Sequence, residues 1–207
     1  MAVRAYWHQG NIRDFGDGIT PIRVKEFFAT NSLSIQTLAT VNATLTAKRL
    51  PLKSGAVVDA TLIAAPSSAK NSTDEGDSEM HQTIKGNQWR FGTKTHIGVD
   101  ADSGPVHAVL GTAANVNDVT QAYVLVHSDG TEMFADAGYQ GVEKREEMQD
   151  INVNWHVAMR PGKRKVLDKS TPMGAIMEKL KKAKANICAI GEHSFRVVKR
   201  QFGHVKV

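Results

Sequence analysis

The run of small and apolar residues from Gly55 to Ala65 constrains this chain most, because a single aspartate, Asp59, interrupts it. A short apolar run that is rich in valine and bounded by turn-forming residues is typical of a buried β-strand. An unpaired carboxylate in apolar surroundings is costly, so a buried aspartate is normally paired or bound to a metal ion. The run therefore predicts a core strand at 55–64 that carries a functional carboxylate.

Two further acidic residues lie in comparable settings. Asp136 ends a strand-like segment at 133–136, and Glu192 lies in a helix-like segment at 191–201 that is rich in positive charge. Three carboxylates gathered around one point repel each other unless a divalent cation neutralises them, and hard cations such as Mg²⁺ prefer oxygen ligands. We therefore predict that these three acids form a Mg²⁺ site suited to phosphodiester chemistry.

The remaining pattern predicts an α/β chain with an antiparallel pair inside a mixed sheet. Strands are predicted at 55–64, 94–100, 105–111, 132–136 and 153–159. Helices are predicted at 34–49, 117–127, 143–150, 173–184 and 187–201, with a polar loop at 66–82 and a basic loop at 160–165. At 207 residues the chain fits one domain, placed at 51–207, with a smaller and partly helical N-terminal region at 1–50.

Positive charge is concentrated near the C-terminus. Residues 151–207 contain 13 lysines and arginines and three acidic residues, which gives +10, whereas the whole chain carries +5. Such a segment predicts a polyanionic partner such as a nucleic acid. The predicted DNA contacts are Lys163, Arg164 and Lys165 in the basic loop, and Arg196, Lys199 and Arg200 after Glu192. On a helix, Arg196 and Lys199 share the face of Glu192 and would contact backbone phosphates.

Other features narrow the setting of the chain. Cys188 is the single cysteine, so neither a disulfide framework nor a cysteine zinc cluster is available. No apolar run reaches membrane-spanning length, and residues 1–8 lack the apolar core of a secretory signal. We therefore expect a protein of the reducing cytoplasm that associates with the nucleoid and not with a membrane.

Several motifs follow one another along the chain: Val57-Val-Asp-Ala-Thr-Leu-Ile63, Lys85-Gly-Asn-Gln-Trp89, His96-Ile-Gly-Val-Asp100, Thr112-Ala-Ala-Asn-Val-Asn-Asp118, Phe134-Ala-Asp-Ala-Gly-Tyr-Gln-Gly141, and the segment from Glu192 to Gly203. From about residue 36 onwards, these motifs and their order resemble those of DDE transposases of the bacterial IS5 group. The resemblance implies an RNase H-like fold in which Asp59, Asp136 and Glu192 are the catalytic, metal-binding acids. It also implies two Mg²⁺ ions, for which Mn²⁺ can substitute, inverted-repeat DNA ends as substrate, and a homodimer.

The chain departs from the group at its third motif, Tyr-x2-Arg-x3-Glu-x6-Lys. Glu192 and Lys199 keep their spacing, but Ala185 stands at the tyrosine position and Cys188 at the arginine position. Residues 1–20 do not resemble the family, and relatives continue through further helices where this chain ends at Val207. We therefore expect a truncated or decayed copy with weak or no catalytic activity.

Other interpretations remain open from the sequence alone. The chain could be another RNase H-like nuclease, or a non-catalytic DNA-binding fragment that inhibits complete transposases. Glu192 could form a helical salt bridge with Arg196, and Asp136 could simply form a turn. Trp89 and Phe91 could stack on a base or cover a sheet edge. Three further aspartates are predicted to be turn and cap residues: Asp100, Asp102 and Asp118.

Overall fold

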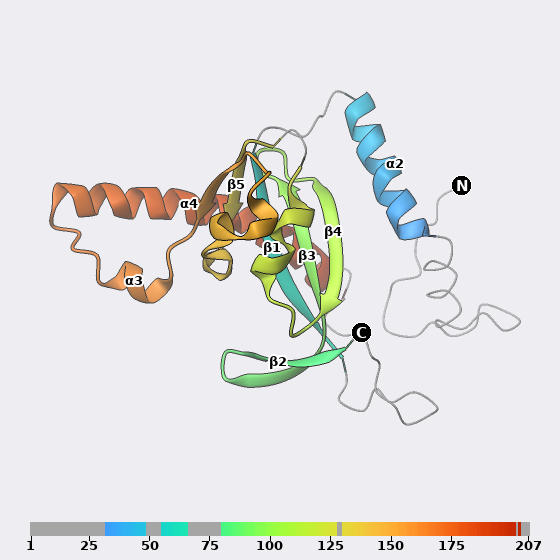
Figure 1. Cartoon of the computed structure of the whole chain (residues 1–207), viewed down its shortest axis with the longest axis horizontal. Helices are drawn as coiled ribbons and strands as arrows, with labels where there is room; N and C mark the ends of the chain where they lie inside the picture. The colour runs from blue at the N-terminus through green and yellow to red at the C-terminus, as the bar shows by residue number, and fades with distance from the viewer. Residues whose placement is uncertain (1–31, 49–54, 66–79, 128–129, 202, 204–207) are drawn as a thin grey trace, which may run out of the picture.

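The structure is a computed structural model that describes residues 32–48, 55–65, 80–127, 130–201 and 203 (Figure 1). In this part of the chain, six strands form one mixed sheet of order β2-β3-β1-β5-β6, with β4 also paired to β3. The strands are β1 Gly55–Ala64, β2 His81–Lys85, β3 Gln88–Asp100, β4 Val106–Ala113, β5 Glu132–Ala135 and β6 Asn154–Val157. β3 pairs antiparallel with β1, β2 and β4, whereas β5 pairs parallel with β1 and β6. The predicted α/β chain with a mixed sheet is confirmed.

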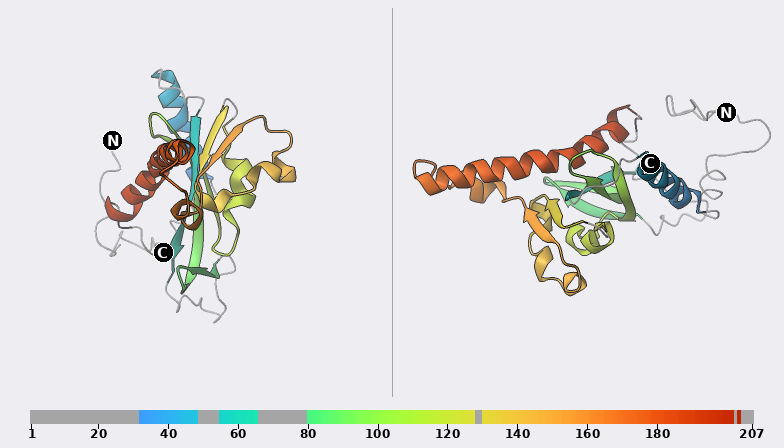
Figure 2. Two further views of the ribbon diagram at one scale, coloured as in Figure 1. Left: turned by 90° about the vertical axis from the view of Figure 1, so that its left-hand side faces the viewer. Right: turned by 90° about the horizontal axis from the view of Figure 1, so that it is seen from above.

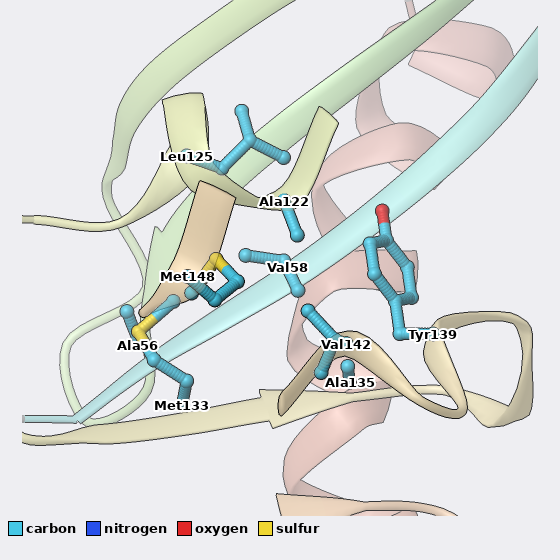
Figure 3. Packing of buried hydrophobic residues seen from close by; sticks show 9 residues of the cluster. All are labelled: Ala56, Val58, Ala122, Leu125, Met133, Ala135, Tyr139, Val142 and Met148. Carbon is cyan, nitrogen blue, oxygen red and sulfur yellow. The ribbon is translucent and has the colours of Figure 1, made fainter. Parts of the chain in front are cut away.

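One face of the sheet is covered by short 3₁₀ helices (Figures 2 and 3). Ala56 and Val58 of β1 pack there with Met133 and Ala135 of β5 in a buried cluster. The covering helices supply Ala122, Leu125, Tyr139, Val142 and Met148. These helices are η1 Asp118–Leu125, η2 Ala137–Tyr139, η3 Val142–Lys144 and η4 Glu146–Met148.

A long helix, α4 (Pro172–Arg196), covers the other face. Val57 lies between Ala56 and Val58 and points the opposite way, because successive side chains of a strand alternate between its faces. It packs in a second cluster with Ile97 and Val99 of β3 and Phe195 of α4. Ile187 and Ile190 of the same helix are partly buried against this cluster. The C-terminal half of α4 is therefore held on the sheet by apolar contacts.

Helix α2 (Leu33–Ala47) agrees with the helix predicted at 34–49, but its apolar side chains are not buried as the spacing suggested. Ile35 is 71% exposed and Val41 is 47% exposed. Asn42 Nδ2 donates a hydrogen bond of 3.2 Å to the backbone oxygen of His107 on β4. The division at residue 50 stays a prediction, since 1–31 and 49–54 lie outside the described residues.

The prediction of a helix at 143–150 is wrong, because two short 3₁₀ helices separated by Arg145 occupy that segment. Val142 and Met148 are both buried there. Six residues correspond to about 240° around an α-helix, so one continuous helix would point these two side chains in different directions. Arg145 has extended backbone angles, which breaks the helix and lets both side chains reach the core.

The predicted C-terminal elements also need correction. The helices predicted at 173–184 and 187–201 form one helix up to Arg196, followed by a π-helical turn at Val197–Gln201. Ala185 and Asn186 do not interrupt it, because alanine favours helix and the backbone can continue through asparagine. The predicted basic loop contains a short helix, α3 (Pro161–Lys165), which starts with the proline at a position that needs no N–H donor.

The β2–β3 hairpin was missed, because 66–82 was predicted as a loop and the next strand only from residue 94. Residues 66–79 lie outside the described part, but His81 already belongs to β2. Gly86 and Asn87 form the turn with φ of 58° and 62°. Two successive positive φ values are typical of a two-residue hairpin turn, and Gly-Asn is one of its sequence signals. None of the described helices has the length and apolarity needed to cross a membrane.

Candidate functional site

The sheet register brings Asp59 and Asp136 together. Asp59 follows Val57 by two residues and therefore faces α4 as Val57 does. In the parallel pair β1–β5, Val57 is opposite Phe134 and Val58 is opposite Ala135. Continuing this register by one residue places Asp136 beside Asp59. Two strands thus present their carboxylates on the face that α4 covers.

Gly191 brings the third acid to the same place. A Cβ atom built at Gly191 would lie 2.9 Å from the Cβ of Asp59 and 3.3 Å from its Oδ2. It would also lie 3.3 Å from Cγ1 of Val57. Helix α4 therefore passes close to β1 at a residue that has no side chain. Glu192 is the next residue and is carried to the edge of the site.

All three predicted acids line one cavity of about 730 Å³. Among its other lining residues are the cations Lys85, Arg196, Lys199 and Arg200. The structure therefore places three of the six predicted DNA contacts with the three acids. In the part of the chain that is described, no three histidine, cysteine, aspartate or glutamate side chains come close enough to hold a metal ion. Joint metal binding by the acids stays a prediction.

Asp59 is held in the neutral form more strongly than an ordinary aspartate. The pKa of its carboxyl group is raised from 3.8 to about 7, mainly by burial and to a smaller extent by the charges of Asp136 and Glu192. The backbone N–H of Ala60, which donates to Oδ1 at 2.8 Å, acts in the opposite direction. A cation in the cavity would reverse the increase, because opposite charge favours the ionised carboxylate.

Asp136 forms a turn and lines the cavity at the same time. Its Oδ1 accepts a 2.8 Å hydrogen bond from the N–H of Gly138 and caps η2. The side chain is exposed, yet the surrounding atoms raise the pKa of its carboxyl group through partial desolvation, with a smaller contribution from Asp118. The turn interpretation is thus confirmed, whereas the role of Asp136 as a metal ligand stays a prediction.

The donor set fits a hard divalent cation. In both Asp59 and Asp136, a backbone N–H engages Oδ1, and no described residue donates to either Oδ2. The two oriented carboxylates keep an oxygen for a ligand, and Mg²⁺ is bound mainly through such oxygens. Glu192 is exposed beside them and can add a third carboxylate.

Asp100 is confirmed as a turn residue, whereas the interpretation of Asp118 was incomplete. Oδ1 of Asp100 accepts hydrogen bonds from the N–H groups of Asp102 and Ser103. Asn117, not Asp118, caps η1 with its side chain. Asp118 instead pairs with Lys94 at 2.8 Å and contributes to the potential at Asp136. Asp118 is thus a fourth acid near the site, and Lys94 forms an ion pair with it.

Two lysines line the cavity in different ways. Lys199, predicted to contact DNA, donates to Oγ1 of Thr61 at 2.5 Å and to the backbone oxygen of Leu62 at 3.0 Å. Lys85 was missed as a site residue, and the signal that could have found it was the Gly86-Asn87 hairpin turn. Burial lowers the pKa of Lys199, and the charge of Lys85 lowers it further. The two ammonium groups therefore repel each other.

Cys188 and Tyr139 lie within the field of the same acids. The pKa of the Cys188 thiol is raised to about 11, mainly by burial and to a smaller extent by Asp136, Asp59 and Glu192. Tyr139 is 1% exposed, and burial, followed by nearby acids, raises the pKa of its phenol far above the usual value. A phenol held so firmly in its neutral form is a poor nucleophile.

The other three predicted DNA contacts lie in α3 and do not line the acid cavity. Arg164 donates to both carboxylate oxygens of Glu178, at 3.1 and 2.7 Å. A guanidinium engaged in such a two-pronged pair has fewer donors left for a phosphate. Lys163 and Lys165 form no ion pair with a described residue.

If α3 contacts DNA, its three cations should contribute unequally. We expect Lys163→Ala and Lys165→Ala each to reduce the slope of log affinity against log salt concentration by about 0.9, as for the loss of one phosphate contact. Arg164→Ala should change it less, because Glu178 already engages this side chain. Fluorescence anisotropy with duplex DNA from low to high salt measures the slopes. If the slopes of all three variants equal that of the unaltered chain, α3 does not contact the DNA.

The chain matches one known protein family. Residues 50–207 match the family model described as the transposase DDE domain. The match spans well over half of the 207 residues, and the chain belongs to this family. No solved structure matches the chain significantly.

Proposed function

We propose that this chain is a DNA transposase of the IS5 group that cleaves DNA at the inverted-repeat ends of an insertion sequence and transfers the freed strand. We further propose an RNase H-like arrangement of its sheet, two Mg²⁺ ions held by Asp59, Asp136 and Glu192, and a homodimer that pairs the ends. The observation that carries the proposal is the presence of all three acids in one cavity of a chain from the DDE family.

Each part of the cavity has a chemical role in such a reaction. Bound divalent cations would activate the attacking hydroxyl and stabilise the leaving oxygen of an in-line displacement. Asp59 and Asp136 are held by strands and by backbone N–H donors, so their remaining oxygens are oriented in advance. Arg196 and Arg200, exposed at the rim, would position the DNA through its phosphates.

The direct test is cleavage of a plasmid that carries the genomic DNA flanking this gene on both sides. We expect nicks with 3′-hydroxyl ends at a terminal repeat, in Mg²⁺ or Mn²⁺ and not in EDTA. Asp136→Ala should abolish them, whereas Asp150→Ala, which removes an exposed acid of the opposite face, should not. Metal-dependent nicks that are spread over the plasmid without regard to the repeat would favour another RNase H-like nuclease.

Cys188 is the residue that we expect to limit this activity. It lies one helical turn before Glu192, and its thiol experiences the negative charge of all three acids. The related transposases carry arginine here, whose guanidinium keeps its positive charge at any working pH. A neutral thiol leaves the repulsion between the carboxylates uncompensated.

We therefore expect Cys188→Arg to increase end cleavage about tenfold, since about 1.4 kcal/mol of improved electrostatics corresponds to that factor. The added charge should also lower the pKa of Asp59, which moves the rising limb of the pH–rate profile to lower pH. Cys188→Met, of similar length and without charge, is the matched control and should give no increase. Cleavage by the unaltered chain as fast as by Cys188→Arg would show that Cys188 does not limit the reaction.

A non-catalytic DNA-binding function is the second candidate. It is favoured by one observation, that the acids of the described chain do not form a group tight enough to hold a metal ion without rearrangement. DNA binding by both the unaltered chain and Cys188→Arg, with no metal-dependent cleavage by either, would support it.

A further inference from the structure

The β2–β3 hairpin has two different faces. Lys85 is opposite Gln88 and Thr83 is opposite Arg90, so these residues share one face. Ile84 is opposite Trp89, and both point to the other face. Trp89 is 70% exposed and Ile84 is 57% exposed, so Trp89 does not cover an edge of the described sheet. The β2–β3 hairpin projects from the rest of the sheet (Figure 1). The alternation of side chains along its strands therefore gives the hairpin one cationic face and one apolar face.

The cationic face lines a second cavity next to the acid cavity. This cavity has a volume of about 380 Å³ and is lined by Leu62, Ala64, Lys85, Arg90 and Lys199. Two of these residues, Lys85 and Lys199, also line the cavity that contains the three acids. The two cavities are therefore adjacent, with this pair of lysines lining both. We call the second cavity the hairpin groove.

Asp59 and Asp136 in the acid cavity act electrostatically on Lys85, and Asp59 also acts on Lys199, so the cations of the hairpin groove are compensated only from outside the groove. Lys85, Arg90 and Lys199 form no ion pair with a described residue, and no acidic residue lines the groove. Arg90 donates only to the neutral side chain of Gln88, at 3.0 Å. Burial and the charges of Lys85 and Arg90 lower the pKa of the Lys199 ammonium group, whereas the charge of Asp59 raises it. Three cations gathered beside an apolar floor repel each other and therefore favour the binding of an anion.

We propose that the hairpin groove binds the DNA strand on one flank of the scissile phosphate, through contacts of Lys85, Arg90 and Lys199 with adjacent backbone phosphates. This inference rests on the proposed function, because the acid cavity is taken as the place of the scissile phosphate. A strand that passes from the acids between Lys85 and Lys199 enters the groove directly. Leu62 and Ala64 form an apolar floor against which a deoxyribose can pack. The β2–β3 hairpin would thus set the path of the DNA relative to the acids.

A site-directed cross-link tests the location of the strand. The introduced thiol of Arg90→Cys, in a Cys188→Ser background that removes the single natural cysteine, is coupled to an azidophenacyl group and irradiated with a terminal-repeat duplex in EDTA. We expect a cross-link confined to a few adjacent nucleotides beside the nick site. Lys144→Cys in the same background is the matched control, since Lys144 is exposed on η3, on the opposite face of the sheet. It should give no such cross-link.

Salt-dependent binding tests the phosphate contacts without any need for cleavage. Lys85→Ala and Arg90→Ala should each weaken binding several-fold and lower the slope of log affinity against log salt by about 0.9, whereas Lys144→Ala should leave both unchanged. Thermal unfolding checks that each variant is folded. A confined cross-link and reduced slopes without any nicking would support the groove and contradict the proposed function. Nicking by the unaltered chain, combined with unchanged slopes in the variants or with a cross-link far from the nick, would contradict DNA binding in the hairpin groove. The proposed function would then still stand.

Discussion

Asp59→Asn is expected to abolish metal-dependent DNA cleavage and, at the same time, to stabilise the metal-free protein at pH 8. The loss of cleavage should exceed about 10³-fold, because removal of one group that stabilises the charge of the transition state costs about that factor. Asparagine has nearly the same shape as aspartate and can accept the N–H of Ala60, so the fold should be retained. A gain in stability that accompanies a loss of function separates a functional carboxylate from a structural one.

The stabilisation follows from the raised pKa of Asp59. The folded value is about 7 and the unfolded value is 3.8, so the folded protein binds a proton more tightly than the unfolded chain does. This contribution to stability is fully present below pH 3.8 and is lost as pH rises through 7. At about 1.36 kcal/mol per pKa unit the loss is up to roughly 4 kcal/mol, and water in the open cavity reduces it to about 2–3 kcal/mol. Asparagine does not ionise and avoids this cost.

Urea unfolding of the unaltered chain and Asp59→Asn in EDTA, at a series of pH values from 4 to 8, measures the effect. The difference in free energy of unfolding should be near zero at pH 4 and grow until about pH 8. Asp150→Asn removes an exposed acid of the opposite face and should produce no such growth. Adding Mg²⁺ at pH 8 should raise the stability of the unaltered chain and not of Asp59→Asn. If Asp59→Asn is less stable at pH 8 than at pH 4 relative to the unaltered chain, the carboxylate is a structural group.

The two strand-borne acids of the candidate site could be predicted from the sequence because side chains of a strand point alternately to its two faces. The apolar run at 55–64 and the segment ending at Asp136 are core strands, and alternation then determines which side chains share a face. The pairing of β1 with β5 could not be derived in the same way, since register depends on contacts between distant segments. Glu192 was predicted on a helix, but its distance from the two aspartates depends on how closely that helix approaches β1.

Other errors have identifiable physical causes. Lys85 was missed because its two-strand hairpin is mostly exposed and therefore carries no run of buried apolar residues, only a Gly-Asn turn. The continuity of α4 through Ala185 and Asn186 was missed because the periodicity of apolar residues weakens there, although no helix-breaking residue is present. In the described structure, Met173, Ile176 and Leu180 of its N-terminal half are all exposed. The apolar side chains of α4 are thus buried only in the half of the helix that contacts the sheet.

Gly191→Ala is expected to have the second largest effect, because Gly191 sets the distance between α4 and the strand that carries Asp59. Alanine is the better helix former by about 1 kcal/mol, so in an open position this substitution would stabilise the protein. Here the new methyl group would lie 2.9 Å from the Cβ of Asp59 and 3.3 Å from Cγ1 of Val57. Both neighbours belong to the central strand β1 and cannot move aside, so α4 must shift outwards.

An outward shift of α4 should cost about 1–3 kcal/mol of stability from overpacking and should move Glu192 away from Asp59 and Asp136. A displacement of about 1 Å at a reacting centre can reduce the rate about 10²-fold, and we expect a loss of that size in end cleavage. The rate is best measured in the Cys188→Arg background, where the larger signal makes the loss visible. The free energy of unfolding, measured in EDTA, is a second readout that does not depend on activity.

Gly162→Ala provides the matched control for this substitution. Gly162 is also helical, in α3, and a Cβ built there would meet no atom within 4 Å. The same chemical change should therefore leave end cleavage unchanged and leave stability equal or slightly higher. If Gly191→Ala behaves like Gly162→Ala in both readouts, α4 does not approach β1 closely enough for Glu192 to join the two aspartates. The three-acid site would then lack its helical member, and catalysis would have to depend on Asp59 and Asp136 alone.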